Sequence, residues 1–137
     1  MTGVQTCALP ICGDLGFVVG PRLNAAGRLE DMSIGIECLL TDDPETASRL
    51  AVELDTINRE RRNIESGMRD QAFAYVDAMD SRNMPSCVCV YDKGWHQGIV
   101  GLIASRVKDR CHRPVIAFAR EGEGQLDRKS TRLNSSH

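Results

Sequence analysis

The chain lacks several features that would assign it to a class of protein at once. No apolar run approaches the length of about 18 residues that a membrane-spanning helix needs. No basic region followed by an apolar core, the pattern of a secretory signal peptide, opens the chain. Basic residues are not in excess, because 17 Lys and Arg stand against 19 Asp and Glu for a net charge of −2. These absences predict a cytoplasmic protein without a membrane partner, and any contact with nucleic acid must be local.

Recognisable catalytic and metal-binding patterns are also absent. The six cysteines contain no CxxC pair, which argues against a zinc site and favours reduced thiols. His, Asp and Glu do not recur at metal-ligand spacing, and no Ser/His/Asp set suggests itself. The sequence therefore predicts no catalytic residue and no metal ligand within this chain.

The two ends of the chain are related to each other at the level of DNA. One coding sequence for the last eleven residues, 127–137, has a reverse complement that encodes residues 1–11, with GTG as the start codon. The string also resembles a common sequencing adapter. We therefore expect residues 1–12 and 127–137 to be adapter-derived and not native, which leaves 13–126 for the fold.

The native part opens with short elements. The apolar run Leu15–Val19 predicts a strand or an extended segment, which Gly20 and Pro21 end. Small residues among two arginines and an asparagine over 22–29 predict a tight turn where backbone approaches a ligand. Ser33 to Leu40 predicts a short helix.

A long helix is predicted over about 44–80. Asp43 at the cap, Pro44 in the first position and Glu45 in the first turn form a strong start. Apolar residues then recur every three or four positions, except in the polar segment 58–63. Such a length favours a helix that bridges two domains and is more solvated in its middle, over the alternative of a coiled coil.

A βαβ unit is predicted beyond this helix. The apolar runs 87–91 and 114–119 are typical of buried strands, and 98–110 of the helix that crosses between them. The loop 93–97 then lies at the carboxyl end of a strand and the amino end of a helix, where α/β sheets bind ligands and helix amides favour an anion.

Two groups of residues are candidates for binding a phosphate or a base. Arg22, Asn24 and Arg28 form the first, because Arg binds phosphate bidentately; the alternative is an ion pair of either arginine with Glu30 or Asp31. The second group comprises His96, Gln97 and Gly98. For His96 a ligand contact remains one possibility, and the alternative is that it caps the helix or packs beside Trp95. Arg59, Arg61 and Arg62 are more typical of a solvated face than of a nucleic-acid track.

Three blocks of sequence carry a family resemblance: Gly20–Leu29, Ala51–Arg62 and Gly94–Gly101. Together they resemble the RecJ-type exonucleases of the DHH phosphoesterase superfamily. The resemblance implies an α/β fold with the C-terminal piece of a DHH domain over 13–42, a long connecting helix over 43–82, and the first βαβ unit of a DHH-associated domain over 83–126.

The resemblance also implies an activity for the parent protein. It would be a single-stranded-DNA-specific 5′-to-3′ exonuclease of DNA repair and recombination, using Mn²⁺ or Mg²⁺ held by Asp and His residues. The family's Asp motifs, its Asp-His-His motif, and its Gly-Arg-Ser and Gly-Gly-His motifs do not occur in this chain. We therefore expect the fragment alone to be inactive and to contribute only substrate-binding surface, with Arg28 as the leading phosphate contact.

Implied partners are single-stranded DNA and, as further candidates, other DNA-repair proteins. Two alternatives are a related DHH phosphodiesterase acting on short oligonucleotides or cyclic dinucleotides, and a nucleic-acid-binding module of the kind found in alanyl-tRNA synthetases. The block Asn24–Arg28 disfavours the phosphodiesterase, and the long helix with the block before it disfavours the module.

Overall fold

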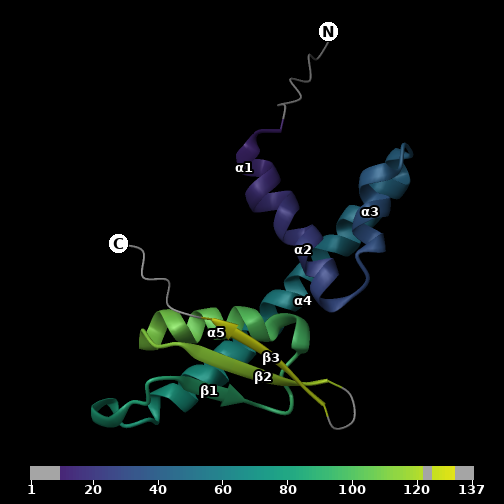
Figure 1. Cartoon of the computed structure of the whole chain (residues 1–137). Coiled ribbons are helices and arrows are strands. Elements are labelled where there is room, and N and C mark those ends of the chain that lie inside the picture. The colour runs from purple at the N-terminus through teal and green to yellow at the C-terminus, as the bar shows by residue number, and fades with distance from the viewer. Residues whose placement is uncertain (1–9, 122–124, 132–137) are drawn as a thin grey trace. The chain divides into compact units, whose positions relative to one another are not determined.

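The computed structural model describes residues 10–121 and 125–131. The chain divides into two compact units, Met1–Arg59 and Glu60–His137. The long helix α4 (Pro44–Asp77) contributes residues to both (Figure 1). Helices and a small sheet make up the described residues, which confirms the predicted α/β class.

The first helical segment corrects two predictions. Leu15–Val19, predicted as a strand or an extended segment, forms the π-helical turn η1 between α1 (Cys12–Asp14) and α2 (Gly20–Leu29). The predicted turn at 22–29 lies inside α2. The amide of Gly20 bonds to the carbonyl of Leu15, five residues back. This wide turn directly precedes Pro21, which has no N–H to donate and whose ring clashes with a regular helical turn. The helix therefore passes through a position where the sequence suggested a stop.

The small residues of α2 serve helix packing instead of a turn. Ala25 and Ala26 are fully buried. At Gly35, which is buried in α3 (Ser33–Leu40), an added Cβ would lie 3.0 Å from Cδ2 of Leu23, so the two helices approach closely there. The short helix predicted over Ser33–Leu40 is confirmed.

Helix α4 begins as predicted. Asp43 caps it, because its Oδ2 accepts a hydrogen bond of 3.0 Å from the amide of Thr46, and Pro44 takes the first helical position. Its 34 residues span about 51 Å. The predicted apolar stripe is largely confirmed, since its buried members are Leu50, Leu54, Ile57, Met68, Ala72 and Val76.

The polar middle of α4 is not uniformly solvated, which corrects the prediction. Asn58 is only 2% exposed. Arg61 and Glu65, one turn apart and joined by an ion pair, have side chains that are each 15% exposed. Arg59 and Arg62 are exposed, as predicted. A polar side chain can be buried when its hydrogen-bonding groups are paired, and apolar periodicity alone cannot detect that.

The second unit contains the predicted βαβ arrangement. A turn of 3₁₀ helix, η2 (Ser81–Asn83), leads to β1 (Val88–Tyr91), and α5 (Gln97–Cys111) connects β1 to β2 (Val115–Glu121). The two strands are parallel, with Val88 opposite Val115, and α5 packs against the sheet (Figure 1). Buried side chains alternate along both strands and recur on α5, and the fully buried ones there include Val88, Ile99, Val100, Ile103, Val107 and Val115.

A third strand, β3 (Gln125–Thr131), was not predicted. It pairs antiparallel with β2, in the sheet order β1-β2-β3. Backbone pairing uses only N–H and C=O groups, so residues 127–131 can join a strand whatever their origin. The adapter origin of 1–12 and 127–137 stays a prediction, and most of these residues (1–9 and 132–137) lie outside the described part of the chain.

Candidate nucleic-acid interface

The six predicted contact residues fall into two groups in different units. Arg22, Asn24 and Arg28 lie on α2 in the first unit. His96, Gln97 and Gly98 lie at the start of α5 in the second.

Arg22 is held by two partners in the first unit. Its Nη2 lies 2.6 Å from Oδ1 of Asp55 on α4, and its Nη1 donates a hydrogen bond of 2.6 Å to the carbonyl of Val18. Its side chain is 32% exposed. The predicted alternative of an ion pair was right in kind for Arg22, but the partner is Asp55, thirty-three positions away, and not Glu30 or Asp31.

Asp55 bridges two guanidinium groups. Its Oδ2 lies 2.5 Å from Nη2 of Arg59, one turn further along α4, while Oδ1 faces Arg22. Partial burial raises the pKa of Asp55, but the charges and hydrogen bonds of Arg59 and Arg22 together outweigh it, so the pKa is lowered. The three side chains line a pocket of about 420 Å³ with Ser48, Ala51, Val52 and Thr56. Two cations and one carboxylate give this cluster a net positive charge.

Asn24 and Arg28 lie elsewhere on α2. They are four positions apart and hence on one face, and both are exposed. At about 100° per residue, Arg22 lies roughly 120° around the helix from Arg28. The structure thus places Asn24 and Arg28 together and sets Arg22 apart. Arg28 also lies in the last turn of α2, where a cation complements the helix dipole.

His96 caps α5, as one of the two alternatives for this residue predicted. Its Nδ1 accepts a hydrogen bond of 3.1 Å from the amide of Gly98, and its carbonyl accepts from Ile99 and Val100. Because Nδ1 accepts, the neutral ring carries its proton on Nε2. The amides of Gly98 and Ile99, which could have met an anion, are thus already bonded. Gln97 is exposed beside them, and Gly98 is half-buried.

The loop before His96 is braced by α4, through contacts that the sequence analysis missed. The Nε1–H of Trp95, a residue 3% exposed, donates a hydrogen bond of 2.9 Å to Oε1 of Gln71. The hydroxyl of Tyr75 donates to Oδ2 of Asp92 at 3.4 Å, and Oδ1 of Asp92 accepts from the amide of Gly94 at 2.8 Å. The local Asp-x-Gly turn was detectable from sequence, but the partners on α4 were not.

Several basic side chains elsewhere in the second unit, Arg61, Arg106 and Arg110 among them, are engaged in ion pairs. Glu65 lies 3.6 Å from Nη2 of Arg106 in addition to its pair with Arg61. Arg110 pairs with Asp77 at 2.8 Å and stacks on the ring of Phe73 at 4.7 Å. For Arg61, the predicted solvated face is wrong, and all these cations have protein partners.

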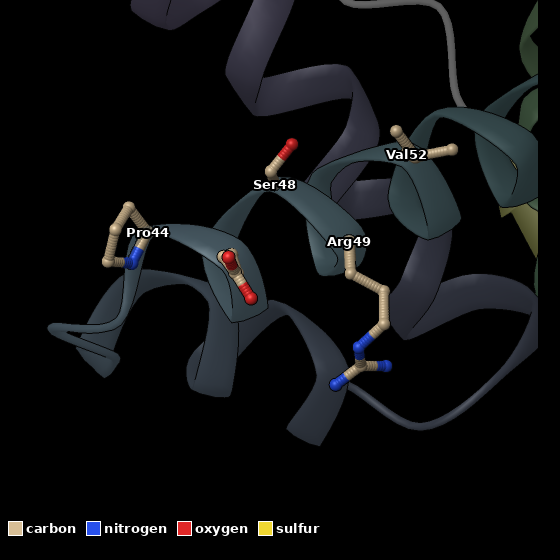
Figure 2. A pocket seen from close by; sticks show the side chains of 5 residues that line it. Pro44, Ser48, Arg49 and Val52 are labelled. Carbon is tan, nitrogen blue, oxygen red and sulfur yellow. The ribbon is translucent and has the colours of Figure 1, made fainter.

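A further surface hollow adjoins the pocket beside Arg22, because Ser48 and Val52 line both. It has a volume of about 570 Å³ and is lined by Pro44, Glu45, Ser48, Arg49 and Val52. All five come from the first turns of α4, and Figure 2 shows Ser48 and Arg49 leaving this helix in different directions. No polar groups converge there, so the hollow does not suggest a binding chemistry.

The described residues contain no group of three or more His, Cys, Asp or Glu side chains placed to hold a metal ion. Among the same residues, no helix is both long and apolar enough to cross a membrane.

Comparison with known proteins shows which proteins the chain is similar to. No family model matches the chain. It is 52% identical over 118 residues to the single-stranded-DNA-specific exonuclease RecJ of Dickeya dadantii, a match that covers 85% of this chain and 20% of that protein. The RecJ of Escherichia coli K12 is 48% identical over 126 residues, or 90% of this chain and 22% of that protein. The chain is therefore similar to RecJ proteins over most of its own length.

Solved structures agree with this similarity. The crystal structure of Thermus thermophilus RecJ in complex with Mg²⁺ has a TM-score of 0.71 at 29% identity, over 86% of this chain and 18% of that one. An exonuclease RecJ structure bound to manganese has a TM-score of 0.72 at 29% identity, over 88% and 29% of the two chains. The chain thus spans about one fifth of the length of the curated RecJ proteins that it matches.

Proposed function

We propose that this chain is the part of a metal-dependent, single-stranded-DNA-specific 5′-to-3′ exonuclease that contacts the substrate strand. The observation that carries this proposal is the 48–52% identity to proteins named single-stranded-DNA-specific exonucleases, over 85–90% of the chain and hence over both units. In the proposed division, 13–42 ends the DHH domain, 43–82 is the connecting helix, and 83–126 begins the DHH-associated domain.

We assign phosphodiester hydrolysis to residues of the parent enzyme outside this chain. RecJ structures have been solved with Mg²⁺ and with Mn²⁺, and in the parent enzyme either ion would activate a water molecule and stabilise the phosphoryl charge. The described residues offer no suitable ligand set, so no hydrolytic step is derived from them. We expect the purified chain to show no nuclease activity in Mn²⁺ or Mg²⁺.

The binding surfaces follow from the exposed groups. Arg28 would contact a DNA phosphate, with Asn24 beside it on the same helix face. In the second unit, an anion would meet Nε2–H of His96 and the side chain of Gln97, since the amide of Gly98 is already bonded. The parent enzyme would act in the cytoplasm in DNA repair and recombination, with other repair proteins as candidate partners.

The test is binding of the whole chain to a fluorescent dT oligonucleotide, followed by anisotropy at 50 and 200 mM salt. Arg28→Ala should weaken binding and make it less dependent on salt, because one phosphate contact is lost. Arg49→Ala is the matched control: Arg49 is an exposed arginine of the same unit, with a side chain 65% exposed. If both variants bind like the original chain at both salt concentrations, the assignment of Arg28 is wrong.

A further inference from the structure

The guanidinium group of Arg22 is fixed by contacts within the protein. Its Nη2 meets Oδ1 of Asp55 at 2.6 Å, and its Nη1 meets the carbonyl of Val18 at 2.6 Å. A long arginine side chain normally loses rotamer freedom when it binds a ligand. Here two contacts, one from α4 and one from the preceding turn, have already removed much of that freedom.

Asp55 is well suited to hold this arrangement. Its second oxygen is occupied by Arg59, so both carboxylate oxygens are used. The Arg59 side chain is 77% exposed and the Arg22 side chain 32%, so both cations remain reachable from solvent. The cluster keeps a net positive charge after the carboxylate has neutralised one arginine.

We propose that Asp55 is a positioning residue, which orients Arg22 to receive a phosphate of the DNA strand. This rests on the proposed function, since it assumes that the first unit binds DNA. Groups that contact a ligand are most effective when a second set of contacts locks their rotamers, and the Asp55 carboxylate supplies such a contact. Asp55 itself would not touch the DNA, because a carboxylate repels phosphate.

The proposal predicts that removal of the Asp55 carboxylate lowers the affinity for DNA, whereas the loss of a negative charge alone would raise it. Removing an acidic side chain from a DNA-binding surface ordinarily strengthens binding, because repulsion of the polyanion falls. If Asp55 positions Arg22, then Asp55→Ala weakens binding instead. Glu53→Ala is the matched control: Glu53 is an acid on the same helix, with a side chain 47% exposed and only a loose pair with Arg49 at 3.9 Å.

The experiment measures the affinity of the whole chain for a dT oligonucleotide, with Asp55→Ala, Arg22→Ala, the double variant and Glu53→Ala. Asp55→Ala and Arg22→Ala should each weaken binding by roughly tenfold and lower the slope of log affinity against log salt by about 0.7, the value of one single-strand phosphate contact. The double variant should bind like Arg22→Ala alone, because Asp55 acts only through Arg22. Glu53→Ala should bind equally or more tightly.

Circular dichroism separates positioning from folding, and Asp55→Asn serves as a second variant that keeps the size of the side chain. The proposal would be overturned if Asp55→Ala lost affinity while its helix content and its salt slope stayed unchanged. It would also be overturned if Asp55→Ala and Glu53→Ala bound DNA with equal affinity. Additive losses in the double variant would overturn it too. Absence of DNA binding by the unsubstituted chain would overturn the proposed function together with this inference, whereas binding that is insensitive to Asp55 removes the inference alone.

Discussion

The brace between α4 and the loop before α5 can be tested by removing the acceptor for the Trp95 indole. Gln71→Met keeps the length of the side chain and a similar helix propensity but leaves the Nε1–H of Trp95 without the oxygen that lies 2.9 Å away. Since Trp95 is only 3% exposed, much of the desolvation cost of this donor remains. A buried donor that loses its partner costs about 1–3 kcal/mol. Because Gln71 is exposed, water can approach the indole N–H in the variant. We therefore expect a loss in the free energy of unfolding near the lower end of this range, about 1 kcal/mol.

Trp95 is the only tryptophan of the chain, so its fluorescence reports this loop directly during unfolding in urea. Arg62→Met is the matched control, because Arg62 is another exposed polar residue of α4 within the same unit. Such a surface change is expected to alter the free energy of unfolding by less than about 0.5 kcal/mol. Equal midpoints for Gln71→Met and Arg62→Met would refute the idea that Gln71 holds Trp95, and with it the idea that α4 sets the position of His96.

Two further predictions concern acid stability and the end of α5. The pKa of Asp55 is lowered in the folded chain, so its stabilising contribution is complete above the usual aspartate range near pH 4 and is lost as the pH falls through its lowered pKa. Thermal melts between pH 7 and 2.5 should therefore show a smaller acid-induced loss of stability for Asp55→Asn than for the original chain, and parallel curves would contradict this. His112 ends α5 in the left-handed region at φ 49°, so His112→Gly should raise the free energy of unfolding by up to about 1 kcal/mol. A drop in the urea midpoint would show that the imidazole makes a contact worth more than this backbone strain.

The elements that sequence analysis predicted well are those with strong local signals. The start of α4 was marked by Asp43 and Pro44, which act on the first turn and need no tertiary partner. The βαβ unit was marked by two apolar runs with a helix-length segment between them, and the parallel pairing of β1 and β2 followed from that order.

The failures had two physical causes. Over 15–29, the β-branched residues predicted a strand and the small residues predicted a turn. The structure instead has one helical segment, which is stabilised by the burial of Ala25 and Ala26 and which accommodates Pro21 through a wide turn. Propensity is a weak guide where tertiary contacts compensate for it. In the candidate interface, residue type and spacing picked out Arg22 and His96. Their partners were found only in the structure, because Asp55 is distant in sequence and because the His96 side chain had more than one plausible use.

The most direct test of the proposed interface is an NMR titration of the ¹⁵N-labelled chain with a dT oligonucleotide. We expect the largest shifts at the amides of Arg22, Asn24, Arg28, His96, Gln97 and Gly98, with little change at Glu45 and Arg49 of the hollow that begins at Pro44. Shifts that cluster along that hollow, or that spare both α2 and the start of α5, would contradict the proposal that these two surfaces contact single-stranded DNA.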